Sequence, residues 1–576
     1  MLPSLRVPLA VLATLSAAIA QDHAPSGRPS VLVKFADDSG VFVTSGGALK
    51  WGSGSDLSRV AAILYRAGGI EPMAKLPLEV LDRWHRLADA GLPAGQLRPG
   101  HLARWVRVRI APGHSAEDLV AALREEAAIT SAYIEPEPVL AGLAPSPPQD
   151  LPPPTPDFTS HQVYRAPAPS GFGVDATHGI YGARGETVRF YHVEDDWFAQ
   201  HEDLESVTNA SFLGGVTSQN TPGANHGTGV IGCVVASRNG YGMTGLADLA
   251  TARLVNWSLN GGVPDAITAA IAEASPGDVI TLVAGYNLRL VKPDDYVPIE
   301  YFQAPFDVIL TGTALGVVVI EAALNGDNDL DDPRFSHRFD LGFRDSGAIL
   351  VGATDGPALV RASFSNYGSR IDCNGWGGQV ATIGYGDLWI PNQDVLQAYS
   401  QGYAGTSAAT ALTTGLLVSL QGVAERQLGR RLSPLEIRGL LRNHGTAVPG
   451  EIGRRPDLVA ILGALGLPDA LSVTPFDVAL GGSLTFDMSG APGGGFALSM
   501  ALHPADLDVG LGRHLHLDPA WFVPITSFAL PTGTATWTIT VPNDPSLRDL
   551  DLFFQGVVVD THGVARLSSS HDVHLH

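Results

Sequence analysis

Between residues 158 and 466, short apolar strands alternate with helical segments, and this alternation restricts the possible fold more than any other feature. The clearest strands lie at 188–193, 278–283, 317–320 and 348–351. They are apolar along most of their length, which is typical of strands covered on both faces. Strands that alternate with helices form a parallel sheet with helices on both of its faces. The sequence therefore predicts an α/β domain over residues 158–466.

The region before this domain has a different pattern. Strands are expected at 31–35, 105–110 and 132–134, and a helix should begin after Ser115, which has the spacing of a capping residue. We therefore expect a small α+β domain within residues 21–144. The proline-rich run at 145–157 can form neither a helix nor a ladder, so it should be an exposed linker that is open to cleavage.

The region after the central domain alternates apolar and polar residues with a period of two. Runs of this kind occupy 483–486 and 536–541, and a longer apolar strand follows at 550–559. Glycine and proline residues separate the runs. The sequence predicts a C-terminal β-sandwich over 467–576.

The first twenty residues have the pattern of an export signal. Arg6 precedes an apolar run at 7–18, and Ala18-Ile19-Ala20 resembles a cleavage site. The apolar run is too short to span a bilayer. We therefore interpret residues 1–20 as a signal peptide and expect a secreted, periplasmic or cell-surface protein without a membrane span after signal removal. In that setting Cys233 and Cys373 either pair with each other or stay separate buried thiols.

The charge of the chain excludes some partners. Lys and Arg number 36 against 58 Asp and Glu, which gives a formal net charge of -22. Nucleic-acid-binding proteins normally present a basic face. We expect no nucleic-acid partner.

Three segments of the central domain carry groups suited to nucleophilic catalysis. Ser407 begins a helix of small residues, where backbone N–H groups and the helix dipole stabilise negative charge. His226 begins a second helix and could serve as a general base for the serine. Asn325 follows a buried strand, at the end where ligand sites of parallel sheets lie, and could donate to an oxyanion.

Taken together, these segments resemble those of the subtilisin-like serine peptidases, the subtilases. The similarity lies in His226-Gly227-Thr228-x-Val230-x-Gly232, Gly405-Thr406-Ser407-x-Ala409-Thr410 and Ala322-Ala323-x-Asn325-Gly326. The resemblance implies a subtilisin-like α/β fold and hydrolysis of protein or peptide substrates through an acyl-enzyme on Ser407. It also implies that residues 21–144 are a propeptide that assists folding and inhibits the enzyme, so the protein's own propeptide is an expected partner.

One position departs from the family pattern. Subtilases place an aspartate at the end of the first sheet strand, and on that match His192 occupies the position of the triad acid. A neutral imidazole offers no negative charge to the histidine base. Glu194 points to the same face of an extended strand and could replace the missing acid. The alternative is a catalytically impaired pseudoenzyme with the same fold that acts as a binding or scaffold protein.

Two more departures from the family pattern favour the pseudoenzyme alternative. Leu324 replaces the glycine that usually precedes the oxyanion asparagine, and it adds bulk where a substrate carbonyl must fit. Ala411 replaces a proline that usually follows the serine. Both changes lie close to the expected catalytic residues.

The acidic run from Asp327 to Asp332 is the one candidate for a cation site. It lacks the glycine and the distal glutamate of an EF-hand loop, so a solvated acidic turn is the favoured interpretation. Subtilases commonly hold structural calcium, which therefore stays possible here. No metal-ligating cluster of Cys and His stands out, and we expect no cofactor.

Overall fold

The structure is a computed structural model that describes residues 29–44, 48–51, 57–92, 96–140, 142–143, 155–221, 223–511 and 513–576. The expected signal peptide and most of the expected linker lie outside these residues. The chain divides into two compact units, which are described separately. One comprises residues up to Lys75 together with Ala103–Glu137, and the other comprises Leu76–Leu102 together with Pro138–His576.

The small unit is an antiparallel sheet with two helices. Its strands pair in the order β4-β5-β1-β6, so β6 is an edge strand. Ser115 caps α4, because its side chain accepts a hydrogen bond from the backbone N–H of Asp118. The elements are β1 (Ser30–Phe35), β2 (Phe42–Val43), β3 (Leu49–Lys50), α2 (Ser58–Ala67), β4 (Gly68–Pro72), β5 (Trp105–Ile110), α4 (Ala116–Arg124) and β6 (Ile129–Ile134).

The boundary of this unit differs from the expected domain of residues 21–144. Helix α3 (Leu78–Gly91) groups with the large unit because it packs against α8 (Gln303–Ala314). The strands β7 (Val139–Leu140) and β8 (Gly142–Leu143) belong to the large unit as well. Two segments of the expected N-terminal domain are therefore built into the unit that holds the candidate site.

The large unit centres on a mixed sheet that is mostly parallel. Among the described residues, nine strands pair in the order β10-β11-β9-β12-β15-β16-β17-β21-β20. Only β20 runs antiparallel to its neighbour. The strands are β9 (Arg189–Glu194), β10 (Phe212–Leu213), β11 (Thr251–Asn256), β12 (Val279–Leu282), β15 (Val318–Ala322), β16 (Ile349–Thr354), β17 (Cys373–Trp376), β20 (Gly445–Ala447) and β21 (Arg454–Pro456).

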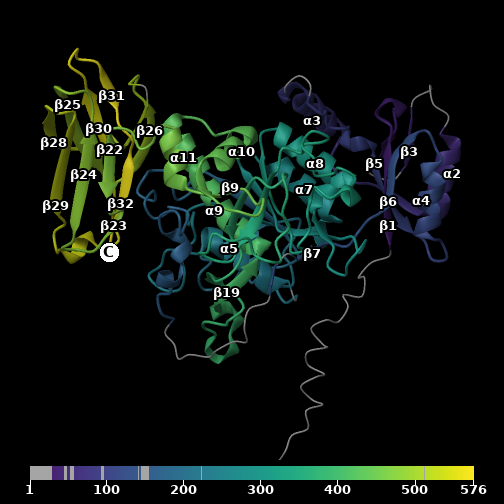
Figure 1. The fold of residues 1–576 in the computed structure, drawn as a ribbon. Helices are drawn as coiled ribbons and strands as arrows, with labels where there is room; N and C mark the ends of the chain where they lie inside the picture. Colours follow the sequence, from purple (N-terminus) through teal and green to yellow (C-terminus); the bar gives the residue numbers. More distant parts are fainter. Residues whose placement is uncertain are drawn as a thin grey trace, which may run out of the picture. The chain divides into compact units, whose positions relative to one another are not determined.

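Helices surround this sheet (Figure 1). Outside it, β13 (Ala284–Asn287) and β14 (Tyr296–Pro298) form one short ladder, and β18 (Val380–Ile383) and β19 (Tyr399–Gly405) form another. Ser433 forms a capping box with Glu436 at the start of α10. The remaining helices are α5 (Ala224–Val235), α6 (Trp257–Asn260), α7 (Val263–Glu273), α9 (Thr406–Leu428), α10 (Pro434–Asn443) and α11 (Leu458–Ala464).

Helix α9 is the central core helix. Within the described residues it is the one helix that is long and apolar enough to cross a membrane, and its apolar window is completely buried inside the fold. Cys233 and Cys373 are separate buried thiols, so they do not form the disulfide that was one of the two expected outcomes.

The C-terminal strands form two larger sheets and a small hairpin. In Figure 1 this region has the yellow-green to yellow ribbons. Residues of both larger sheets share one hydrophobic core that includes Phe486, Phe496 and Phe554. The strands are β22 (Leu471–Thr474), β23 (Asp477–Val478), β24 (Ser483–Ser489), β25 (Gly494–Ala501), β26 (Pro504–Asp508), β27 (His514–Leu517), β28 (Val523–Leu530), β29 (Thr534–Thr540), β30 (Asp551–Val559), β31 (Ala565–Leu567) and β32 (His571–Leu575).

Candidate active site

Three sequence-predicted residues reach the candidate site from three separate elements. His226 lies near the start of α5, Ser407 lies near the start of α9, and Asn325 follows the end of β15. The last strand residue before Asn325 is at the carboxyl end of a parallel strand, where sites of such sheets form. The fold therefore brings these residues together although they are far apart in the sequence.

The serine and the histidine are in hydrogen-bonding contact. Ser407 Oγ lies 3.0 Å from His226 Nε2 and 3.3 Å from the carbonyl oxygen of Val283. The Ser407 side chain is fully buried, and His226 is 3% exposed. This geometry allows His226 to take the proton of the serine hydroxyl.

The acid in contact with His226 is Glu194, the last residue of β9. Its Oε2 atom lies 2.6 Å from His226 Nδ1, which donates the hydrogen bond. Its Oε1 atom accepts a bond of 2.8 Å from the backbone N–H of Asp195. Ser407, His226 and Glu194 thus form a continuous chain of hydrogen bonds.

His192 does not contact the histidine base, which corrects its expected place in the triad. Its Nδ1 atom accepts a hydrogen bond of 2.9 Å from Trp197 Nε1. The proton of the neutral ring therefore lies on Nε2, which is 3.8 Å from Glu194 Oε2. That distance exceeds hydrogen-bonding range. Of the two open alternatives, a missing acid or its replacement by Glu194, the structure favours the second, because the Glu194 side chain reaches His226.

Burial determines the ionisation of this pair. It raises the pKa of Glu194 above its ordinary value, while the nearby His226 opposes the shift. Burial also lowers the pKa of His192 well below its ordinary value, and His226 acts in the same direction. His192 is therefore neutral at neutral pH and adds no charge beside Glu194.

The two acids that follow Glu194 bind a loop instead. Asp195 accepts a hydrogen bond from the hydroxyl of Thr221, and Asp196 accepts bonds from the backbone N–H groups of Asn220 and Thr221. Both aspartates lie beyond the last residue of β9, where the chain has left the strand. Of these three consecutive acids, Glu194 is the one directed at His226.

A close approach of chain segments requires a glycine next to the histidine. A Cβ atom on Gly227 would lie 2.8 Å from Trp197 Cδ1, so a larger residue would displace the indole. The same indole donates to His192. The only signal for Trp197 in the sequence is its position three residues after Glu194, at the end of the first sheet strand.

The Asn325 amide is held in a defined orientation. Its Oδ1 atom accepts bonds of 2.9 Å from the backbone N–H and 3.0 Å from the hydroxyl of Thr406. Because the oxygen accepts both bonds, Nδ2 is the atom of this amide that would meet an oxyanion. Thr406 immediately precedes Ser407, so the amide is fixed beside the serine.

Asn366 holds the turn that carries Asn325, a role that the sequence did not reveal. Its Nδ2 atom donates to the carbonyl oxygen of Ala323 at 2.6 Å, and its Oδ1 atom accepts from the backbone N–H of Asn328 at 2.8 Å. Its own backbone N–H donates to the carbonyl oxygen of Leu324 at 3.0 Å. Its signal in the sequence is the segment Ala362-Ser363-Phe364-Ser365-Asn366-Tyr367-Gly368, which resembles a subtilase segment.

Two short strands of the chain itself lie beside the candidate site. Strand β7 pairs antiparallel with β13, with Leu140 opposite Ala284 and Val139 opposite Gly285. Strand β8 pairs antiparallel with β19, with Gly142 opposite Gly405 and Leu143 opposite Ala404. Val283, whose carbonyl lies close to Ser407, precedes β13, and Ser407 follows β19 by two residues. The two ladders therefore flank the serine.

The acidic run from Asp327 to Asp332 is bonded to the protein. Asp327 pairs with Arg361 at 2.8 Å, and Asp331 accepts bonds from the backbone and the hydroxyl of Ser369. In the part of the chain that the structure describes, no group of three or more His, Cys, Asp or Glu residues is arranged to hold a metal ion. A calcium ion stays a prediction from the resemblance alone.

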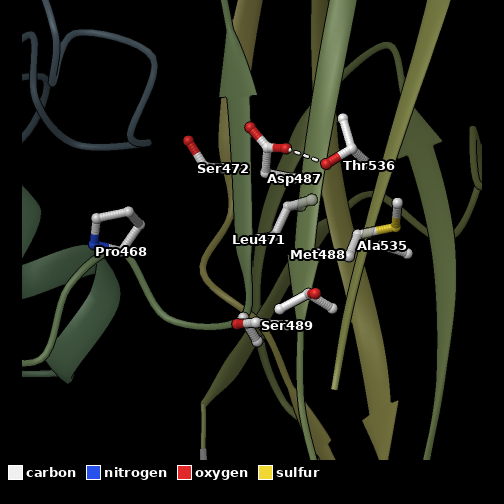
Figure 2. Close-up of a pocket in the computed structure, with 10 residues that line it drawn as sticks. Pro468, Leu471, Ser472, Asp487, Met488, Ser489, Ala535 and Thr536 are labelled. Atoms are coloured by element: carbon white, nitrogen blue, oxygen red, sulfur yellow. Dashed lines mark hydrogen bonds between the residues drawn. The ribbon is translucent and has the colours of Figure 1, made fainter. Parts of the chain in front are cut away.

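A separate cavity of about 350 Å³ lies on the three-stranded C-terminal sheet and contains none of the residues above. Figure 2 shows Asp487 accepting a hydrogen bond of 2.6 Å from the hydroxyl of Thr536, with Ser472, Leu471 and Met488 around them. The cavity has one ionisable side chain and no nucleophile with an activating base. It offers no alternative catalytic centre.

Comparison with known proteins gives a consistent result. The sequence profile of the subtilase family matches residues 176–463. The chain is 29% identical over 196 residues to subtilisin DY of Bacillus licheniformis, which covers 33% of this chain and 65% of that protein. It is 28% identical over 261 residues to subtilisin Savinase of Lederbergia lenta, which covers 44% of this chain and 82% of that protein.

The chain spans less than two thirds of the length of some of these relatives. It covers 58% of the M-protease of Shouchella clausii (strain KSM-K16). Among solved structures, a protease of Pseudoalteromonas arctica PAMC 21717 is 21% identical, with 54% of this chain and 99% of that chain covered and a TM-score of 0.38. A serine protease of Aeromonas sobria is 16% identical, with 75% and 95% covered and a TM-score of 0.39.

Proposed function

This chain belongs to the subtilase family, and from that premise we propose that it is a serine endopeptidase made as an exported precursor. The observation that carries the proposal is the hydrogen-bonded chain from Ser407 through His226 to Glu194. A serine with an adjacent base, itself oriented by a carboxylate, is the arrangement of an activated nucleophile. Protein or peptide substrates are the class that such a nucleophile serves in this family.

The mechanism follows from the positions of these atoms. Ser407 Oγ attacks the carbonyl carbon of the substrate while His226 Nε2 takes the hydroxyl proton. Glu194 accepts from His226 Nδ1–H and stabilises the imidazolium that forms. Asn325 Nδ2 and the backbone N–H groups at the start of α9 donate to the oxyanion.

The second half of the reaction uses the same groups in reverse. His226 gives its proton to the departing amine, which breaks the peptide bond and leaves an acyl-enzyme on Ser407. Water then attacks the ester, again with His226 as base, and the acid product leaves. No cofactor is needed for either half.

The strands β7 and β8 support the proposal of a self-inhibited precursor. They occupy the edges of β13 and β19 on which an extended substrate would pair, and the Ser407 side chain is fully buried in this state. An external substrate cannot reach the serine until this segment leaves. The N-terminal residues through 141 would then act as a propeptide, as the sequence predicts for 21–144.

The pseudoenzyme alternative loses its main support. It rested on His192 in the acid position, whereas Glu194 contacts His226. We therefore propose an active enzyme and not a binding protein with the same fold. Export and the acyl-enzyme remain parts of this proposal.

The proposal is tested by the reactivity of the serine and the role of its acid. The processed protein should react quickly with a fluorophosphonate probe, and Ser407→Ala should remove both this labelling and cleavage of the protein's own chain. Glu194→Gln should slow self-cleavage by about 10⁴, the loss that neutralising the triad acid causes in serine proteases. Asp195→Asn is the matched control and should stay within a few-fold of the unmodified rate, because Asp195 bonds to Thr221.

The opposite results are equally clear. A protein that neither labels nor cleaves itself is not an activated serine hydrolase, and the pseudoenzyme would then be the better account. A Glu194→Gln variant with an unchanged rate would exclude Glu194 as the acid.

A further inference from the structure

Leu324 combines unfavourable backbone geometry with a fully packed side chain. Its φ angle is 73°, in the left-handed region that favours glycine, and its side chain is 1% exposed. It packs with Ala322 and Tyr296. A leucine in this conformation persists only where its surroundings hold it in place.

The backbone around Leu324 is held at several points. The carbonyl oxygen of Leu324 accepts from the backbone N–H of Asn366, and the backbone N–H of Ala323 donates to the carbonyl oxygen of Val351 at 2.9 Å. The carbonyl oxygen of Ala323 accepts from Asn366 Nδ2. The side chain therefore cannot move aside by a shift of its own turn without breaking these bonds.

The Leu324 side chain fills one face of β13. A Cβ atom on Gly285 would lie 2.7 Å from both Cγ and Cδ2 of Leu324. Residues directly opposite each other in an antiparallel pair project to the same face. Since Val139 lies opposite Gly285, Leu324 occupies the face toward which that position of a paired strand projects.

The register of β7 identifies which substrate residue meets this face near the serine. With Leu140 opposite Ala284, the next residue of a paired substrate lies opposite Val283, whose carbonyl oxygen is 3.3 Å from Ser407 Oγ. That residue carries the reactive carbonyl. It is two positions from the residue opposite Gly285, so its side chain projects to the same face, where Leu324 lies.

We propose that Leu324 determines the specificity of the enzyme by restricting the residue before the cleaved bond to small side chains such as alanine, glycine or serine. This inference rests on the proposed peptidase function. The chain's own sequence fits it, because the residue between β7 and β8 is Ala141. An aromatic or long aliphatic side chain at that position would meet Leu324 and the backbone of β13.

The first test uses the chain as its own substrate. Ala141→Phe should slow self-cleavage by at least 100-fold, and adding Leu324→Gly should restore most of the rate. Leu324→Gly alone should still cleave, since alanine fits the enlarged space and glycine suits the φ angle. Leu330→Ala, at another buried leucine of the following loop, is the matched control and should not rescue Ala141→Phe.

The second test uses added peptides that differ only in the residue before the cleaved bond, alanine or phenylalanine. The processed enzyme should favour alanine in kcat/KM, and Leu324→Gly should raise kcat/KM for phenylalanine by about 10 to 200-fold, the range that one methylene gives in an apolar pocket. Leu324→Ala should give a smaller gain and serves if the glycine variant does not fold.

The outcomes separate this inference from the proposed function. An unmodified enzyme that cleaves after phenylalanine as well as after alanine, or an Ala141→Phe chain that cleaves itself at the normal rate, overturns the role of Leu324 and leaves the peptidase intact. A protein without cleavage or fluorophosphonate labelling overturns the proposed function, and the specificity proposal with it.

Discussion

Glu194 and His192 lie two residues apart on β9 and project to the same face of the sheet. The His192 ring accepts a hydrogen bond from Trp197, whereas the Glu194 carboxylate contacts His226. The neutral His192 ring packs beside a buried carboxylate without adding charge to it. His192 thus lies beside Glu194, and Glu194 is the residue that contacts His226.

Placing an acid at the family position should therefore bring little benefit. His192→Asp adds a second carboxylate close to Glu194, and like charges in a buried site raise each other's pKa. We expect kcat/KM at neutral pH to stay equal or fall several-fold, and the acid limb of its pH profile to move to higher pH. Because burial already raises the pKa of Glu194, activity should fall as the pH is lowered and the Glu194 carboxylate takes up a proton.

The neutral variant His192→Asn is the control for this pH profile. Asparagine keeps an acceptor for Trp197 without adding charge, so the acid limb should stay where it is in the unmodified enzyme. A gain of 100-fold or more with His192→Asp would contradict the assignment of Glu194 as the acid.

At the scale of elements, the short strands β7 and β8 connect the N-terminal part of the chain to the candidate site. They pair with β13 and β19 on the two sides of Ser407. The proline-rich connector at 145–157 follows them, and most of it lies outside the described residues. Pairing geometry thus moves the expected site of self-cleavage from the connector to the segment between the two strands.

We expect self-cleavage at the Ala141–Gly142 bond. The register of β7 places the reactive residue of a paired strand opposite Val283, and Gly142 pairs with β19 on the leaving side. Mass spectrometry and N-terminal sequencing of freshly processed protein should find Gly142 as the new terminus, and Ser407→Ala should keep the bond intact. A first cut within 145–157 that survives Ser407→Ala would indicate another protease and would contradict this site.

At the scale of the whole large unit, β32 joins the C-terminal sheets to the catalytic part. The backbone N–H of Asp572 donates to the carbonyl oxygen of Gly179, and that of Tyr181 donates to the carbonyl oxygen of Ser570. Burial raises the pKa of Asp572 to about 6 and that of Glu186 to about 7, and the Asp572 carboxylate adds to the increase at Glu186. Arg184 opposes both shifts, while Asp248 and Asp551 add negative charge nearby.

This acidic pair should make the protein less stable as pH rises. Raised pKa values mean that the folded state holds protons which the unfolded chain releases, so the stability they favour is present at low pH and is lost through about pH 6 to 7. Glu186→Gln should raise Tm at pH 8 by about 2–4 °C, the shift that about 1 kcal/mol gives a domain of 150–250 residues. At pH 5 the variant should match the unmodified protein.

Thermal unfolding of the Ser407→Ala background, which avoids self-digestion, measures this difference. Glu451→Gln, at an exposed position, is the control and should change Tm at neither pH. Equal Tm changes for Glu186→Gln at pH 5 and pH 8 would mean that Glu186 is not protonated in the folded protein.

The sequence by itself determined the elements and the order of the catalytic groups. The strand at 105–110 agrees with β5 (Trp105–Ile110), and the cap at Ser115 forms as expected. Periodicity and caps depend on neighbours within a few residues, so they are readable from the chain alone. The resemblance to a family then placed His226, Asn325 and Ser407 in one site.

Only the tertiary structure decided which acid contacts His226 and which strands flank the serine. Glu194, Asp195, Asp196 and His192 are adjacent in sequence, and their roles depend on strand direction, side-chain length and a loop that bonds two of them. The pairing of β8 with β19 joins segments that are remote along the chain. Such contacts leave no local pattern in the sequence, because they form between segments that meet only when the sheet has folded.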